Sequence, residues 1–338
     1  MSQERYAGID LGGTKILVLI TDEQGSVLGE ERVPTLAAQG PDAVITRIVE
    51  AVRAAAAHAR VAVPDIRVAG VSAPGPINSA EGDITDPPNL PGWHNVRLAR
   101  VLHEQLGVPA VLENDANCAC VGEHQFGAGR GYRHLLYVTI STGIGGGVII
   151  DDKLYAGASG AAGEVGHMGV AMSGPTCGAG HVGCLEAFAS GTAIARRARE
   201  MIAAGGLPRT ARLAEHDPPL SARTVYLAGQ QGEAAAAAII TEAGRYLGVG
   251  LASMINAFNP QAIVLGGGLT NMGDALLGPA IEVARTRSFA QSFMDVRIVE
   301  SELGDNAAAL GAVAVARSRH AAGPSGTAQA TEAPPERR

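Results

Sequence analysis

Lysine is nearly absent from this chain of 338 residues, because Lys15 and Lys153 are the only two. Acidic residues outnumber basic ones, and the formal net charge is −7. A protein that binds nucleic acid or an anionic membrane through its charge carries a basic surface, so the composition favours neither partner. The scarcity of lysine is typical of a base-composition bias, and it makes a lysine inside a glycine-rich loop more noticeable.

Long apolar runs and a secretory signal pattern are also missing. No apolar run approaches the ~20 residues that span a bilayer, and the N-terminus lacks the basic, apolar and small-residue regions of a signal peptide. The four cysteines are not spread as a disulfide framework. We therefore expect a globular protein of the reducing cytoplasm, with no membrane partner.

Strand and helix patterns alternate along the first third of the chain. The predicted elements are strands at 5–9, 16–20, 68–74 and 108–114, a helix at 41–60 and a helix from about 116. A second unit of strand, glycine-rich turn and strand covers 135–151. The alternation favours an α/β layer fold, and two similar units indicate a duplicated fold with a cleft between its halves.

The rest of the chain adds a long helix, a strand and a closing helix. Apolar residues recur at helical spacing from Ile240 to Phe258, and Asn259-Pro260 ends that helix. A strand at 262–268 and an alanine-rich helix at 306–319 follow. The last residues lack aromatic side chains and predict a disordered tail.

Three glycine clusters follow predicted strands and are candidates for binding phosphate or a nucleoside. Glycine lets backbone N–H groups converge on phosphate oxygens, and nearby hydroxyl, lysine and aspartate groups add hydrogen bonds, charge and a magnesium ligand. The candidate residues are Asp10, Gly12, Gly13, Thr14, Lys15, Thr142, Gly143, Gly145, Gly266, Gly267 and Gly268. Each cluster alone is also compatible with a tight turn, and none matches the Walker pattern. Three together favour nucleotide binding.

Asn114 and Asp115 stand at the end of a predicted strand, where α/β sheets place their ligands. A carboxylate there can accept the proton of a sugar hydroxyl that attacks phosphorus. The alternative is that Asp115 only caps the helix that follows. Asn89 lies among prolines, where its amide could bind sugar hydroxyls or simply belong to a turn.

Residues 164–186 combine carboxylates, histidines and cysteines between glycines. Carboxylates and imidazoles can hold a polyol, whereas thiolates and imidazoles can hold zinc. The residues are Glu164, His167, Cys177, His181, Cys184 and Glu186. The segment therefore predicts a sugar pocket braced by a metal ion. Cys118 and Cys120, two positions apart on a helix, face different sides and are expected to be buried apolar residues.

Several motifs together resemble the ROK family of sugar kinases and repressors, and its bacterial glucokinase branch most of all. They are DLGGTK (10–15), GVSAPGPIN (70–78), DPPNLPGW (86–93), ENDANCA (113–119), STGIGGG (141–147), GEVGHM (163–168), GCLEAFAS (183–190) and LGDNAAALGA (303–312). The likeness runs from about residue 5 to about residue 318. Repressors of the family carry a helix-turn-helix region before the first loop, and the start of that loop at residue 10 favours a kinase.

The resemblance implies the duplicated α/β fold of actin, Hsp70 and hexokinase, also called ribonuclease H-like, with two domains and a central cleft. It implies a small domain of residues 1–118 completed by a helix at 305–319, a large domain of 119–304 and a tail of 320–338. ATP and Mg²⁺ would occupy the cleft. Asp115 would be the catalytic base, and the residues that bind sugar would be Asn89, Asn114, Asp115 itself, Glu164, His167 and Glu186. The family also implies a homodimer, with a tetramer as the alternative.

One position departs from the family's zinc pattern. The family places cysteine where this chain has Ala179, which leaves His167, Cys177 and Cys184 as implied ligands. Structural zinc sites usually have four ligands. His181 could be the fourth ligand, water could fill the position, or the loop could hold no zinc.

We expect an ATP-dependent kinase that phosphorylates glucose at its 6-hydroxyl. The alternatives are a kinase for fructose, mannose, N-acetylglucosamine or N-acetylmannosamine, a kinase that uses polyphosphate, and a sugar sensor without catalytic activity.

Overall fold

The computed structural model describes residues 4–87 and 89–323, and these form two compact units. Unit 1 comprises Met1–Gly131, Gly147–Ala162 and Glu302–Arg338, and unit 2 comprises Tyr132–Gly146 and Gly163–Ser301. No helix in the described ranges has both the length and the apolar character needed to cross a membrane.

The strands of the two sheets follow the same topology. The first sheet has the order β3-β2-β1-β4-β7 and the second β10-β9-β8-β11-β12. In the first sheet β1 pairs antiparallel with β2 and parallel with β4, and in the second β11 runs parallel to both β8 and β12. Matching order indicates a duplicated fold, as the two glycine-rich strand pairs predicted. The strands are β1 (Arg5–Leu11), β2 (Lys15–Thr21), β3 (Val27–Pro34), β4 (Ile66–Ala73), β5 (Ile77–Asn78), β6 (Asp83–Ile84), β7 (Ala110–Asn114), β8 (Leu135–Ile140), β9 (Ile144–Ile150), β10 (Lys153–Leu154), β11 (Ala262–Gly266) and β12 (Arg297–Glu300).

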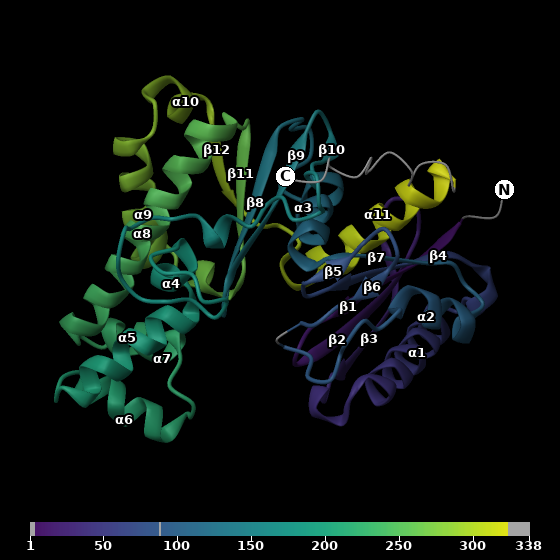
Figure 1. The fold of residues 1–338 in the computed structure, drawn as a ribbon, viewed down its shortest axis with the longest axis horizontal. Helices are drawn as coiled ribbons and strands as arrows, with labels where there is room; N and C mark the ends of the chain where they lie inside the picture. Colours follow the sequence, from purple (N-terminus) through teal and green to yellow (C-terminus); the bar gives the residue numbers. More distant parts are fainter. Residues whose placement is uncertain (1–3, 88, 324–338) are drawn as a thin grey trace, which may run out of the picture. The chain divides into compact units, whose positions relative to one another are not determined.

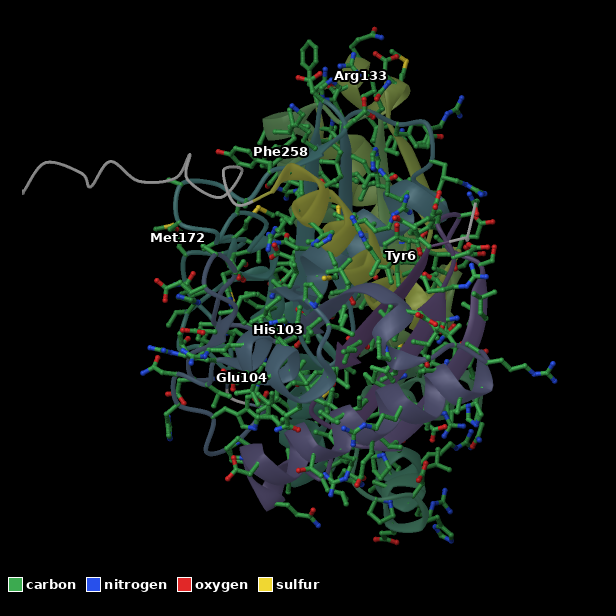
Figure 2. The ribbon with its side chains drawn as sticks, turned by 90° about the vertical axis from the view of Figure 1, so that its right-hand side faces the viewer. Tyr6, His103, Glu104, Arg133, Met172 and Phe258 are labelled. Atoms are coloured by element: carbon green, nitrogen blue, oxygen red, sulfur yellow. The ribbon has the colours of Figure 1, made fainter. Side chains whose placement is uncertain are left out.

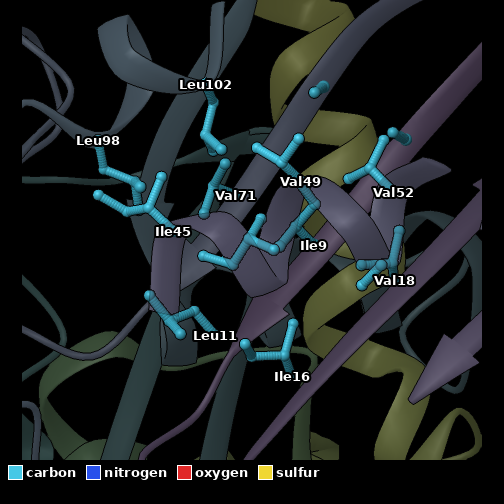
Figure 3. Packing of buried hydrophobic residues seen from close by; sticks show 14 of the residues in the cluster. Ile9, Leu11, Ile16, Val18, Ile45, Val49, Val52, Val71, Leu98 and Leu102 are labelled. Atoms are coloured by element: carbon cyan, nitrogen blue, oxygen red, sulfur yellow. The ribbon is translucent and has the colours of Figure 1, made fainter. Parts of the chain in front are cut away.

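Helices cover both faces of the first sheet (Figure 1). Along β2, Ile16, Val18 and Ile20 pack with α1 and α2, whereas Leu17 and Leu19 pack with α11. Successive side chains of a strand point to opposite faces, so a strand that is apolar throughout must be covered on both sides. Figure 3 shows the larger of these two cores, in which α1 lies over β1 and β2.

The helices of unit 1 are α1 (Pro41–His58), α2 (Leu98–Leu106), α3 (Asp115–Phe126) and α11 (Ala307–Ala322). Those of unit 2 are α4 (Leu185–Ala189), α5 (Gly191–Ala203), α6 (Pro208–His216), α7 (Ala222–Gln230), α8 (Ala234–Phe258), α9 (Asp274–Arg287) and α10 (Ala290–Asp295). Helix α8 ends where Asn259 turns left-handed, at φ 44°, before Pro260. The predicted end of this helix is confirmed.

Glycines let α11 lie directly on its neighbours. A Cβ added at Gly311 would lie 1.6 Å from the carbonyl oxygen of Cys118 in α3, and one at Gly70 of β4 would lie 1.9 Å from that of Ala312. Only glycine permits backbone to approach so closely. The closing helix thus forms part of unit 1, together with the whole of α3.

Two unit boundaries differ from the expected ones. The expected small domain ends at residue 118, whereas unit 1 continues through α3 to residue 131 and includes 147–162. The backbone contact of α3 with α11 is the reason why unit 1 continues through α3. Helix α11 extends to Ala322, three residues into the expected tail of 320–338, and residues 324–338 lie outside the described part of the chain.

Candidate active site

The predicted site residues divide between the two units. Unit 1 holds Asp10, Gly12, Gly13, Thr14, Lys15, Asn89, Asn114 and Asp115. Unit 2 holds Thr142, Gly143, Gly145, Glu164, His167, Cys177, His181, Cys184, Glu186, Gly266, Gly267 and Gly268.

The first glycine loop joins β1 to β2 as a tight turn. The N–H of Gly12 donates to the carbonyl oxygen of Lys15 at 3.0 Å, and the hydroxyl of Thr35 donates to the carbonyl oxygen of Gly12 at 2.6 Å. A Cβ on Gly13 would lie 3.2 Å from the backbone and Cβ of Asn89. The turn and the proline-rich segment that carries Asn89 therefore lie side by side.

Asp10 is the last residue but one of β1. Burial raises the pKa of its carboxyl to about 6, although the hydroxyl of Ser72, which donates to Oδ1 at 2.9 Å, opposes the rise. The negative charge of Asp115 adds to the increase in the pKa of Asp10. Two carboxylates that repel each other favour the binding of a cation near both.

Lys15 of the same loop makes a contact that the sequence did not predict. Its Nζ lies 2.6 Å from Oδ2 of Asp305, in the segment before α11. The hydrogen bond from Lys15 lowers the pKa of Asp305, and Arg32 adds to that effect. The ion pair connects the phosphate-loop candidate with the closing segment of the chain.

The structure separates the roles of Asn114 and Asp115. Asn114 is the N-cap of α3, because its Oδ1 accepts the N–H groups of Ala116 at 3.0 Å and Asn117 at 3.1 Å. Its amide nitrogen remains as the group that can donate to a ligand. Asp115 is the first residue of the helix and its side chain is exposed, with Oδ1 accepting from the N–H of Ala116 at 2.8 Å. The residue that caps α3 is thus Asn114, so the cap alone does not account for Asp115.

Glu113 is a residue of this site that the sequence analysis missed. It is buried, and its carboxylate accepts from the N–H of Asn114 at 2.8 Å and from Nδ2 of Asn117 at 3.1 Å. Arg319 of α11 forms an ion pair with it and donates to the carbonyl oxygen of Leu112 at 3.0 Å. The only sequence signal was the place of Glu113 inside the ENDANCA motif, since its partner lies 206 positions away.

In unit 2 the second and third glycine loops meet at one edge of the sheet. They follow β8 and β11, which are neighbouring parallel strands. Gly267 has φ 88°, and a Cβ there would lie 2.4 Å from the carbonyl oxygen of Ile140. Carboxyl ends of parallel strands are where α/β sheets bind ligands.

Glu186 lies against the second loop. Its Oε2 accepts from the N–H of Ile144 at 3.0 Å, and a Cβ on Gly143 would lie 2.6 Å from the same oxygen. The segment that carries Glu164 is also close, because a Cβ on Gly166 would lie 2.0 Å from the carbonyl oxygen of Ile144. The fold therefore brings this predicted sugar ligand, the second loop and the Glu164 segment together within unit 2.

His167 lies between a carboxylate and a thiol. Its Nε2 is 3.9 Å from Oε2 of Glu164, and its Nδ1 is 3.8 Å from Sγ of Cys177. The Nδ1 of His181 lies at the same distance, 3.8 Å, from Sγ of Cys177. Ligand atoms of these two histidines and Cys177 all lie within 4.8 Å of one another.

These distances fit the donor set of a zinc ion. Zinc with bonds of about 2.3 Å to sulfur and about 2.1 Å to nitrogen holds the two ligand atoms about 3.6 Å apart in a tetrahedron. Cys184 lies beside this group, and burial raises the pKa of its thiol, with the nearby Cys177 adding to the rise. His181 thus offers a ligand atom beside Cys177 and His167, whereas Ala179 offers none. Cys118 and Cys120 are buried in α3 as predicted.

Two matching sheets, each with a glycine-rich turn after its first strand, define the duplicated α/β fold of actin and hexokinase. A sequence comparison then gives the family. The chain belongs to the ROK family, whose profile matches residues 6–319.

Individual relatives agree with this assignment. The chain is 35% identical to a glucokinase of Streptomyces coelicolor over 92% of its length and 96% of that protein. The structure of a ROK hexokinase from Thermus thermophilus superposes with a TM-score of 0.81 at 35% identity, covering 94% of this chain and all of that one. A ROK family glucokinase from Streptomyces griseus, solved with glucose and AMPPNP, gives a TM-score of 0.78 at 32% identity, with 93% and 99% covered.

Proposed function

We propose that this chain is an ATP-dependent glucokinase, which transfers the terminal phosphoryl group of ATP to the 6-hydroxyl of glucose. Membership of the ROK family supports a sugar substrate, and the relatives named as glucokinases support glucose. The observation that carries the proposal is the position of Asp115. It is an exposed carboxylate at the start of a helix that another residue caps, and its charge acts on a second carboxylate, Asp10.

Asp115 would act as the general base. As the 6-oxygen of glucose forms its bond to phosphorus, the bond between that phosphorus and the bridging oxygen of ADP breaks, and the hydroxyl proton moves to the carboxylate of Asp115. Asn89, Asn114, Glu164, His167 and Glu186 would hold the sugar hydroxyls. Orienting the 6-hydroxyl in this way lowers the entropic part of the barrier.

The glycine loops would hold ATP. Their backbone N–H groups can donate to phosphate oxygens, with Thr14, Lys15 and Thr142 adding hydroxyl and charged donors, and Gly266–Gly268 facing the nucleoside. Asp10 would orient Mg²⁺ or its water shell. Magnesium bound with ATP would neutralise part of the charge on the phosphates.

A pair of isosteric variants tests the base. Asp115→Asn should lower kcat by about 100- to 10,000-fold, the range of a lost general base, while the calorimetric Kd for glucose stays within a few-fold. Asp42→Asn is the matched control, because Asp42 is likewise an exposed carboxylate in the first turn of a helix of unit 1, and its turnover should be normal. Near-normal turnover by Asp115→Asn would refute the assignment.

A panel of sugars tests the substrate. Coupled assays with ATP should give the highest kcat/KM for glucose, ahead of fructose, mannose, N-acetylglucosamine and N-acetylmannosamine. A different best sugar would change the substrate and leave the kinase reaction intact. Turnover with polyphosphate and none with ATP would change the donor, and no turnover with any sugar would support a sensor.

We also propose that zinc binds His167, Cys177, His181 and Cys184, with His181 replacing the family cysteine that is Ala179 here. Bound zinc would hold the loop and orient His167 through Nδ1, so that its Nε2 faces the sugar beside Glu164. Protein purified without added zinc should contain about one zinc per chain by metal analysis. His181→Ala should lose the metal, and adding Ala179→Cys should restore it. A zinc content near zero in the wild-type protein would remove the proposal.

The homodimer implied by the resemblance stays a prediction. Size-exclusion chromatography with light scattering would test it, and a mass of one chain or of four would exclude it.

A further inference from the structure

Unit 1 contains a large polar cavity that the proposed kinase reaction does not use. Its volume is about 890 Å³, within the range of about 300–1,000 Å³ that small-molecule sites occupy. The last turns of α3 and α11, the β9–β10 hairpin and the start of β1 line it. All lining residues belong to unit 1, and none of the predicted glucose or ATP ligands is among them.

The charge of this cavity opposes that of the whole chain. Four cationic side chains line it, against two carboxylates, although the chain carries a net charge of −7. The cations are Arg67, Lys153, Arg317 and Arg319, and the carboxylates are Glu4 and Asp152. One of the two lysines of the entire sequence therefore lies here, while the other is in the first glycine loop.

Two of the cations have their charges compensated by carboxylates. Arg319 forms its ion pair with the buried Glu113, and Nε of Arg67 lies 3.8 Å from a carboxylate oxygen of Glu4. In the described part of the chain, no carboxylate lies within ion-pair distance of Lys153 or Arg317. Nη1 of Arg317 donates to the backbone carbonyl oxygen of Glu23, but no carboxylate of the described residues neutralises either charge, so these two charges are the ones available to an anionic ligand.

Contacts fix the Arg317 side chain and the turn that carries Lys153. Arg317 lies 5.1 Å above the ring of Tyr6, which Figure 2 labels, in a cation–π contact. Lys153 follows a tight turn in which Asp151 and Asp152 have φ of 51° and 63°. Oδ1 of Asp152 lies 3.4 Å from Nε2 of His124, a buried residue of α3, so the turn is fixed to that helix.

The chemistry of the lining limits the ligand. Tyr6 is the one phenylalanine, tyrosine or tryptophan among the lining residues, and it is only 5% exposed, with Arg317 over it, so its ring offers no open face to a nucleobase. Amide and hydroxyl groups of Gln125 and Ser318 can bind polar substituents. We propose that this cavity binds a small phosphorylated anion without a nucleobase, with Lys153 and Arg317 contacting its phosphate groups.

Calorimetric titration with inorganic pyrophosphate in magnesium-free buffer tests the site. Wild-type protein should bind it, and Lys153→Gln with Arg317→Gln should weaken binding at least 10-fold. Lys153→Gln alone should already weaken pyrophosphate binding, and it should leave the melting temperature unchanged because Lys153 forms no ion pair with a described residue. Lys153→Arg, which keeps the charge, should bind pyrophosphate as the wild type does. Arg199→Gln, at an exposed arginine of unit 2, is the matched control for lost charge and should bind as wild type does.

Pyrophosphate could instead bind to the glycine loops, and Lys15→Gln distinguishes that location from the cavity. If the cavity is the site, Lys15→Gln binds normally. Loss of binding in Lys15→Gln, with normal binding in the Lys153 and Arg317 variants, would overturn the proposal, as would an absence of wild-type binding at millimolar pyrophosphate. The measurement involves no sugar and no turnover, so its result is independent of whether the chain is a glucokinase.

Discussion

The contact between α3 and α11 predicts that Gly311→Ala destabilises the protein, although alanine is the better helix former. The new Cβ would lie 1.6 Å from the carbonyl oxygen of Cys118 and 2.8 Å from the backbone nitrogen of Gly122. Non-bonded heavy atoms at their optimal separation stand about 3.5–4 Å apart. Both obstructing atoms belong to backbone, so no change of rotamer relieves the clash, and the helices must separate by more than about 1 Å.

The sheet prevents α11 from moving freely. β1 and β4 already contact the backbone of α11 at Gly8 and Gly70. A Cβ added at these glycines would lie 2.2 Å and 1.9 Å, respectively, from the nearest carbonyl oxygen of the helix. Overpacking a closely packed core costs about 1–3 kcal/mol and sometimes more. Alanine regains about 1 kcal/mol through its helix propensity. Because the clash involves backbone on both helices, we expect a net loss of about 2 kcal/mol or more.

Urea unfolding followed by circular dichroism measures this loss. Gly311→Ala should lower the midpoint, and if the two units unfold separately, only the transition of unit 1 should move. Ser318→Ala is the matched control, since it raises helix propensity in the exposed part of the same helix and should shift stability by less than about 0.5 kcal/mol. A Gly311→Ala protein as stable as the wild type would refute the backbone contact between α3 and α11.

Two further variants test carboxylates of unit 1. Burial raises the pKa of Asp10 from 3.8 to about 6, so the native state binds this proton more tightly than the unfolded chain does. The free energy of unfolding therefore falls by up to about 3 kcal/mol as the pH rises from about 4 to above 6. Asp10→Asn should remove that loss in urea unfolding of ligand-free protein at pH 4.5 and 7.5, and the same pH dependence in both proteins would contradict the shift. Glu123 is fully buried and accepts the N–H groups of Ala128 and Leu303, each at 2.9 Å. Glu123→Leu leaves these donors unpaired and should lower the free energy of unfolding by about 3 kcal/mol, whereas Glu123→Gln should lower it less. Melting temperatures equal to that of the wild type would show that these contacts contribute nothing to stability.

Local sequence patterns predicted most of the elements, because strands, turns and helix ends depend on neighbouring residues. Apolar runs on either side of glycine clusters located β1, β2, β8 and β9, and Asn259-Pro260 located the end of α8. Each predicted glycine cluster stands at or after the end of the strand expected for it, but the second continues into β9, so Gly145 lies in that strand, and Gly266 is the last residue of β11. These signals are local, so they need no knowledge of the tertiary structure.

Contacts between distant segments had no such signal. Sequence reasoning left open whether Asp115 caps α3, and the hydrogen bonds of Asn114 decide which residue does so. The expected boundary at residue 118 cuts through α3, since nothing near Cys118 indicates that Gly311 lies against it. The partner of a buried charge depends on which elements the fold brings together, and a single sequence does not contain that information.

The closing segment is more than a completing helix, because it reaches three parts of the proposed catalytic machinery. Asp305 pairs with Lys15 of the first glycine loop, Gly311 lies against the helix that begins at Asp115, and Arg319 pairs with Glu113. The contacts come from one short segment, residues 305–319, so moving that segment would displace a phosphate-loop residue and the proposed base together. Catalytic geometry and the stability of unit 1 are therefore coupled through residues 305–319, and a change that loosens this helix should lower kcat as well as the free energy of unfolding.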